Sequence, residues 1–218
     1  VRKGIPPSLR GEVWKLLLNA QPKNLSNDKD LYSRLLRQTA PKKKSTLKQI
    51  EKDLPRTFPE LPFFQFKGPG QESLRRVLKA YSIYNPEVGY CQGMNFLAAP
   101  LLLVMPDEED AFWCLVKLME RYLPNFYLPD LSGLHADQLV LDSLLQEYLP
   151  DLYKHLQEKG IDPSLYALRW FLTLFARELP LEIVLRIWDV LFAEGSEFLF
   201  RIALAILKLL RDVLLKLD

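Results

Sequence analysis

The stretch 71-QESLRRVLKAYSIYNPEVGYCQGMNFLAAPLLLVM-105 contains two helical segments separated by a short break. In the first segment, apolar side chains recur at i, i+3, i+4 and i+7, the spacing of one helical face: Leu74, Val77, Leu78 and Tyr81. A helix is expected over 71–84, because Pro86 disfavours helical geometry at the residue before it. A second helix is expected to begin close to Cys91 or Gln92 and to reach the end of the stretch.

The rest of the chain shows the same succession of helical periodicity and breakers. Helices are expected over 8–20, 28–38, 46–54, 107–122, 136–149, 151–158, 163–179, 180–192 and 196–217. There is no alternating strand pattern and no fixed-period repeat. The prediction is one all-α domain over 1–218, without a sheet, made of two closely packed helical subdomains. Their expected bounds are about 1–128 and about 129–218, with the seam in the loop 126–133.

Local signals predict several helix faces and ends. The apolar face of 8–20 is expected to carry Leu9, Val13, Leu16 and Leu17. Thr46 and Gln49 have the spacing of a capping box, and Asp107 and Asp162 are expected to cap the helices that follow them. The very apolar stretch 198–217 is interrupted by charged residues, so it is expected to be a core helix and not a transmembrane segment.

Composition excludes several classes of function. The chain has 218 residues, of which 49% are apolar, enough for a sizeable core. Its formal net charge of +2 gives no basic field for nucleic acid. The basic run Lys42, Lys43 and Lys44 is expected to be a solvated loop, the alternative being a patch for a membrane surface or an acidic partner. No signal peptide is visible and the chain opens without methionine, so we expect a domain excised from a longer protein.

The cysteines and histidines indicate neither a disulfide framework nor a metal site. Cys91 and Cys114 form no CxxC pair, which favours a reducing, cytosolic setting. His135 and His155 lie in no metal-binding motif. Cys91 leaves one enzymatic alternative, a thiol nucleophile with His135 or His155 as its base, although a packed cysteine is the simpler interpretation.

Arg56, in 50-IEKDLPRTFP-59, is the first candidate functional residue. It follows Pro55, whose ring fixes one backbone torsion and restricts where the next side chain can point. It is expected beyond the end of a helix, on a turn that presents its guanidinium. Asp53 is expected either to pair with Arg56 or to cap local amides. An exposed pair adds little stability, so its use would be to orient Arg56. On position alone, Arg56 is more often a solvated surface arginine.

Gln92, in 88-VGYCQGMN-95, is the second candidate. Gly89 and Gly93 allow another molecule to approach the backbone closely, and a neutral amide can hold a water by donating and accepting at once. A glutamine in the first turn of a helix is more often a capping or solvated residue. Both candidates lie on turns of a chain without a convincing catalytic base of its own.

Three ordered motifs carry a family resemblance. The pattern RxxxW matches Arg10 and Trp14, IxxDxxR matches Ile50, Asp53 and Arg56, and YxQ matches Tyr90 and Gln92. The stretches GIPPSLRG and LRIWDVLF, near the two ends, extend the match over essentially the whole chain. The chain resembles a TBC domain, the module that activates GTP hydrolysis by Rab GTPases.

The resemblance implies a GTPase-activating protein that is not itself an enzyme. Arg56 matches the family's arginine finger and Gln92 its glutamine finger. Asp53 would steady Arg56, Tyr90 and Gly93 would shape the contact with the GTPase, and Arg10, Trp14 and Ile50 would give structural support.

The implied partner is a Rab-family GTPase in its GTP-bound form. GTP and Mg²⁺ would be bound by that partner, and this chain would need no cofactor of its own. The chain is expected to be a cytoplasmic monomer, recruited to endomembranes peripherally. The alternative on the same fold is a non-catalytic adaptor that binds a GTPase without accelerating hydrolysis.

Overall fold

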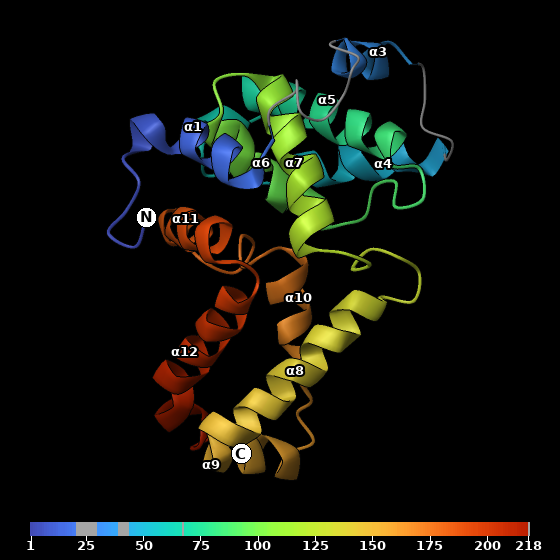
Figure 1. The fold of residues 1–218 in the computed structure, drawn as a ribbon. Coiled ribbons are helices and arrows are strands. Elements are labelled where there is room, and N and C mark those ends of the chain that lie inside the picture. The colour runs from blue at the N-terminus through green and yellow to red at the C-terminus, as the bar shows by residue number, and fades with distance from the viewer. Residues whose placement is uncertain (21–29, 39–43, 67, 218) are drawn as a thin grey trace.

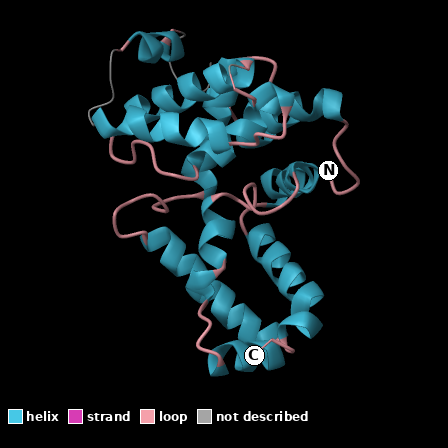
Figure 2. Ribbon diagram, turned by 180° about the vertical axis from the view of Figure 1, so that it is seen from behind, coloured by secondary structure: helices cyan, strands magenta, loops and turns pink. Residues whose placement is uncertain are grey.

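The computed structural model describes residues 1–20, 30–38, 44–66 and 68–217. The chain forms, in order, α1 (Pro7–Leu18), α3 (Leu31–Arg37), α4 (Lys44–Asp53), the 3-10 turns η1 (Leu54–Arg56) and η2 (Pro62–Phe64), α5 (Pro69–Tyr84), α6 (Met94–Val104), α7 (Glu108–Tyr122), α8 (Ser132–Tyr148), α9 (Pro150–Glu158), the 3-10 turn η3 (Pro163–Leu165), α10 (Ala167–Leu172), α11 (Leu181–Glu194) and α12 (Glu197–Leu214) (Figure 1). These ranges contain no strand (Figure 2), so the prediction of an all-α fold is confirmed for the part of the chain described.

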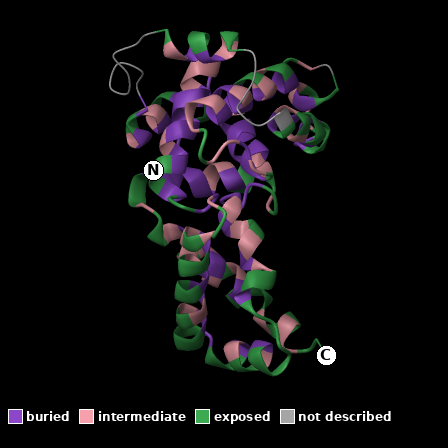
Figure 3. Ribbon diagram, turned by 90° about the vertical axis from the view of Figure 1, so that its right-hand side faces the viewer, coloured by how far each residue is buried: buried purple, intermediate pink, exposed green. Residues whose placement is uncertain are grey.

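The helices form two groups (Figure 1). Helices α1 and α3–α7 lie together in the upper part of the view, and α8, α9, α10 and α12 lie in the lower part. Helix α11 packs on α1 and on α12, and so connects the groups. The buried residues concentrate in the upper part, whereas the end near α9 is mainly exposed (Figure 3). The expected seam falls within the connection from α7 to α8, and the exact bounds of the two halves stay a prediction.

Aromatic side chains fill the core where α1 meets α11. Trp14 and Trp188 are fully buried, with ring centroids 5.8 Å apart. Phe192 meets Trp14 edge-on at 5.1 Å. Such contacts add about 0.5–1.5 kcal/mol each beyond the burial of their area. The same continuous core includes buried residues of both groups of helices, which fixes α11 under α1.

The predicted apolar face of the first helix is only partly correct. Val13 and Leu17 are half-buried and pack against the core, but Leu9 is 54% exposed and Leu16 is 64% exposed. The buried residues of α1 include Arg10, Trp14 and Leu18. The difference arises from hydrogen bonds: Arg10 and Trp14 both donate to a carboxylate of α11. To make these bonds, α1 turns Arg10 and Trp14 inward, and its most apolar stripe faces partly outward.

Other local predictions divide into confirmed and wrong ones. Asp107 and Asp162 accept hydrogen bonds from the main-chain amides two residues on, as caps do. Thr46 lies buried inside α4, so the capping box is wrong. The expected helix 163–179 is instead the turn η3, the short helix α10 and a further turn, because left-handed backbone at Leu174 and Phe175 cannot continue a helix.

Helix α12 is only partly a core helix. Its inward face buries Leu199, Ala203 and Leu207, but Leu209 is 83% exposed. None of the helices within the described ranges is long and apolar enough to cross a membrane. The basic run at Lys42 and Lys43, and the side chain of Lys44, lie outside the described residues.

Candidate functional site

Arg56 is the last residue of the turn η1, directly after α4. Pro55 occupies the second position of this turn, where its missing amide hydrogen removes no needed bond. The Thr57 hydroxyl donates to the main-chain oxygen of Asp53 at 2.7 Å and closes the turn. The Arg56 side chain remains 46% exposed. Arg56 therefore lies beyond the helix end on an exposed turn, as its sequence position predicts.

Asp53 is the anchor of the Arg56 guanidinium. Its Oδ1 accepts from Arg56 Nη2 at 2.5 Å and from Gln49 Nε2 at 3.2 Å, and its Oδ2 accepts from the Tyr90 hydroxyl at 2.5 Å. The expectation of an exposed pair is wrong, because Asp53 is fully buried. A buried carboxylate needs all its hydrogen bonds, so this anchor holds Arg56 more firmly than a surface ion pair could.

Tyr90 connects the two candidate turns. Burial raises the pKa of its phenol well above the usual range, and the hydrogen bond to the Asp53 carboxylate raises it further. Tyr90 therefore stays protonated near neutral pH and donates to Asp53. Because Tyr90 lies two residues before Gln92, the buried Asp53 carboxylate is shared between the Arg56 turn and the Gln92 loop.

The Gln92 loop is a turn between α5 and α6. Helix α6 begins only at Met94, so the expected helix start at Cys91 or Gln92 is wrong by two or three residues. Gly93 has φ +110°, a conformation that a helix cannot contain and that favours glycine. Gln92 is thus exposed ahead of the helix and outside its first turn.

A second buried bridge joins the same two segments. Asn95, in the first turn of α6, donates through Nδ2 to the Thr57 hydroxyl at 2.8 Å, and its Oδ1 accepts from the Gly93 amide at 3.2 Å. Both Asn95 and Thr57 are fully buried. Sequence reasoning missed them, although each is a polar residue within three positions of a candidate, a signal that could have drawn attention to them.

Arg10 and Trp14 belong to a separate cluster. Arg10 Nε and Trp14 Nε1 donate to Asp189 Oδ1 at 3.0 and 2.9 Å, and Arg186 Nη1 donates to Asp189 Oδ2 at 2.7 Å. Asp189 is fully buried on α11, so this cluster ties α1 to α11. Ile50 is fully buried in α4 and packs in the core below the Arg56 turn.

The residues of the cysteine alternative lie on three different segments. The Cys91 sulfur lies 3.8 Å from the main-chain oxygen of Val88 and 4.0 Å from that of Tyr127. His135 is on α8, with Nδ1 3.3 Å from Gln138 Oε1. His155 is on α9, at the far end of the lower group of helices (Figure 1). Within the described ranges no three His, Cys, Asp or Glu residues are grouped as a metal site would require.

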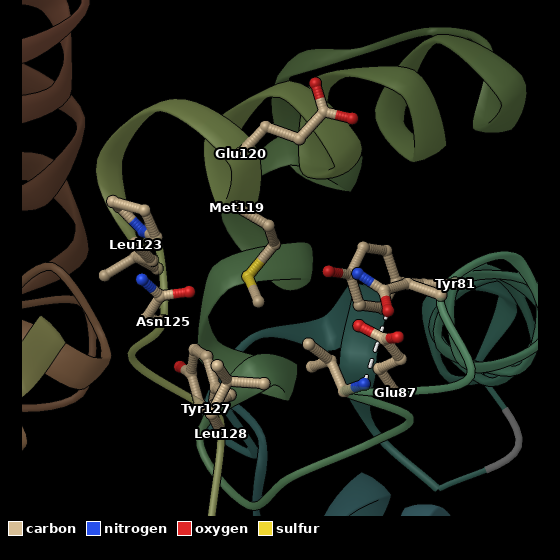
Figure 4. Close-up of a pocket in the computed structure, with 11 residues that line it drawn as sticks. Tyr81, Glu87, Met119, Glu120, Leu123, Asn125, Tyr127 and Leu128 are labelled. Carbon is tan, nitrogen blue, oxygen red and sulfur yellow. Dashed lines mark hydrogen bonds between the residues drawn. The ribbon is translucent and has the colours of Figure 1, made fainter. Parts of the chain in front are cut away.

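Two hollows adjoin the candidate turns. A groove of about 350 Å³ is lined by Arg56, by Phe58 and Phe96, and by Arg177 from beyond α10. A smaller pocket, of about 190 Å³, lies behind the start of the Gln92 loop and is bordered by residues of α5, α7 and the loop after α7 (Figure 4). In that pocket Met119 is directed inward and the Glu120 carboxylate is turned away. The site thus combines an anchored cation, an exposed amide and adjoining hollows.

The sequence model of the Rab-GTPase-TBC domain family matches residues 7–215, and the chain belongs to this family. TBC1 domain family member 10A of Mus musculus is 46% identical over 208 residues, which cover 95% of this chain and 41% of that protein. Rab GTPase-activating protein eat-17 of Caenorhabditis elegans is 46% identical over 219 residues, which cover 100% of this chain and 24% of that protein.

Solved structures give the same result. The Chlamydomonas flagellar RabGAP TBC domain superposes with a TM-score of 0.87 at 38% identity, covering 99% of this chain and 71% of that one. The Ypt/Rab-GAP domain of Gyp1p superposes with a TM-score of 0.84 at 30% identity, covering 100% of this chain and 80% of that one. The chain spans less than half the length of the two curated relatives named above.

Proposed function

We propose that this chain accelerates GTP hydrolysis by a Rab-type small GTPase, supplying Arg56 and Gln92 to the partner's active site. The observation that carries the proposal is the pair of hydrogen bonds at Asp53, which joins the exposed Arg56 turn to the loop of Gln92. Two side chains from separate segments are thereby held on one buried support. Such support is what a catalytic group needs in order to keep its geometry when the partner docks.

Arg56 would act on the charge that develops during phosphoryl transfer. As the γ-phosphoryl group leaves, negative charge moves towards the oxygen between the β- and γ-phosphates. A guanidinium at that oxygen stabilises the transition state more than the ground state, and such fingers accelerate GTP hydrolysis by about 10³ to 10⁵. Asp53 would hold Arg56 ready for that position, so less ordering is needed on docking.

Gln92 would orient the attacking water. Its side-chain oxygen can accept from the water while its amide donates to it or to the γ-phosphate. The exposure of Gln92 and the left-handed backbone of Gly89 and Gly93 on either side suit a loop that enters another protein's site. The nucleotide and Mg²⁺ would belong to the GTPase, so hydrolysis occurs on the partner and this chain is an activator.

An adaptor that only binds the GTPase is the competing function. The buried support favours the catalytic function, because docking alone does not require an arginine anchored by a fully buried carboxylate. In either case the GTP-bound Rab would bring the chain, as a monomer, to the cytosolic face of an endomembrane. A thiol hydrolase, in contrast, would depend on Cys91 and be indifferent to Arg56.

The test is phosphate release from a panel of GTP-loaded Rabs, with Arg56→Ala, Gln92→Ala and Cys91→Ser compared with the wild type. The proposal expects at least one Rab to respond, both finger variants to lose the acceleration and Cys91→Ser to keep it. Arg201→Ala, at an exposed arginine of α12, is the matched control. Acceleration that survives in both finger variants contradicts the proposed mechanism, and binding without acceleration favours the adaptor.

A further inference from the structure

The groove beside Arg56 contains a second arginine that the proposed finger mechanism does not use. Arg56 and Arg177 both line this hollow of about 350 Å³. Its lining also includes Phe58 and Phe96, together with Leu179 and Leu181. The groove is therefore formed jointly by the segment after α4, by α6 and by the segment before α11.

A turn with left-handed backbone precedes Arg177 and directs the chain back towards α6. Leu174 and Phe175 have φ +46° and +65°, which bulky side chains rarely adopt, and both are fully buried. Trp188 Nε1 donates to the main-chain oxygen of Leu174 at 3.0 Å and holds this turn. The guanidinium of Arg177 consequently lies over the Phe96 ring, 5.8 Å from its centroid. Left-handed backbone at bulky residues is often retained where a site needs it.

The charges of the groove favour an acidic occupant. Arg56 is bound to Asp53 at 2.5 Å, whereas the ion pair of Arg177 with Glu178 is long, at 3.7 Å. Glu60 is the acidic residue among those lining the groove. A cation held over an aromatic ring keeps its charge available, and the apolar side chains around it offer a surface for an apolar group.

We propose that Arg177 is a specificity-determining residue that binds a carboxylate on the GTPase, while a neighbouring apolar side chain of the GTPase fills the groove. This inference rests on the proposed function: a GTPase that receives Arg56 must cover the groove that Arg56 lines. Arg177 then selects among GTPases by the presence of an acidic residue at the matching position. Its contribution is to binding, and Arg56 and Gln92 carry the chemistry.

Steady-state kinetics with the responding GTP-loaded Rab separate these roles. Arg177→Glu is expected to raise KM by more than about tenfold, because like charges then face each other, and to change kcat by less than about twofold. Arg177→Met keeps a side chain over Phe96 but removes the charge, so KM should rise less and the salt dependence of kcat/KM should weaken. Arg201→Glu, at an exposed arginine of α12, is the matched control and should leave KM unchanged.

A binding measurement keeps this inference distinct from the finger mechanism. Dissociation constants for the GTP-loaded Rab are measured in an Arg56→Ala background, with and without Arg177→Glu. Weaker binding in the double variant supports the inference even if acceleration does not depend on Arg56. An unchanged KM and Kd in Arg177→Glu, or a loss confined to kcat, overturns it. If Arg177→Glu does not fold, as judged by its melting curve, the KM and Kd of Arg177→Met replace those of Arg177→Glu. Values equal to the wild type then overturn the inference.

Discussion

Tyr90 donates a hydrogen bond to Asp53 Oδ2 at 2.5 Å, while Oδ1 of the same carboxylate accepts from Arg56. One buried side chain thus receives a donor from each of the two candidate turns. Each turn presents an exposed candidate residue, Arg56 or Gln92. Their mutual position is fixed by this shared acceptor and by the bridge from Asn95 to Thr57.

Tyr90→Phe should lower both stability and acceleration. The change leaves Asp53 Oδ2 without its donor in a buried environment, which costs about 1–3 kcal/mol. The loosened Gln92 loop should reduce kcat by roughly tenfold, as a misplaced catalytic group does. Urea unfolding and single-turnover phosphate release measure the two effects. Tyr148→Phe, at a residue 61% exposed, is the control and should change neither quantity.

Gly93→Ala should slow hydrolysis, whereas Gly160→Ala should only destabilise the fold. An alanine at Gly93 would find ordinary space, with Thr173 Cγ2 at 3.5 Å, but its φ of +110° is forbidden to an L-residue. Relief of that strain moves the Gln92 loop. Gly160, with φ +65° and no atom within 4 Å of the added carbon, bears a backbone penalty of about 1–2 kcal/mol far from the site. Equal kcat values for the two variants would contradict this explanation.

Asp189→Ala should destabilise the fold without a specific effect on kcat. Removal of the carboxylate leaves Arg10 and Trp14 without their shared acceptor, and the loss of one partner of a buried pair costs about 3–5 kcal/mol. Activity measured well below the melting temperature should remain near the wild-type value per folded molecule. A large fall in kcat of the folded protein would instead connect this cluster to catalysis. Asp212→Ala, on the exposed end of α12, is the control.

Asp137→Asn should stabilise the fold at neutral pH. Burial raises the pKa of Asp137 to about 6. A carboxyl group with a raised folded-state pKa favours folding below its unfolded pKa, near 4, and loses that contribution as pH rises through about 6. The neutral amide avoids this loss, so the gain at pH 7 should be on the order of 1 kcal/mol for this partly exposed group. Urea unfolding at pH 4 and pH 7 measures it, and a gain of equal size at both pH values would refute the electrostatic cause.

The sequence was sufficient wherever a local rule decided the structure. Helical spacing and proline positions predicted the existence of the helices between residues 71 and 158, although α6 begins two or three residues later than expected and α8 begins four residues earlier, at Ser132. The aspartate caps were correct at Asp107 and Asp162. Prediction from sequence failed where contacts with residues far away in the chain override local preference. In α1, the hydrogen bonds of Arg10 and Trp14 to α11 decided which face is buried, and after α10 buried left-handed residues interrupted an expected helix.

For the candidate site too, some features followed from the sequence and others only from the tertiary structure. The sequence by itself determined the all-α class, the family and the identity of Arg56 and Gln92 as candidates, because these depend on residue types at fixed spacing. Only the tertiary structure decided that Asp53 is a fully buried support, that Thr57 and Asn95 form a second bridge, and that Arg177 faces the groove of Arg56. The physical reason is that burial and shared hydrogen bonds arise between segments far apart in the chain, and no local pattern records them.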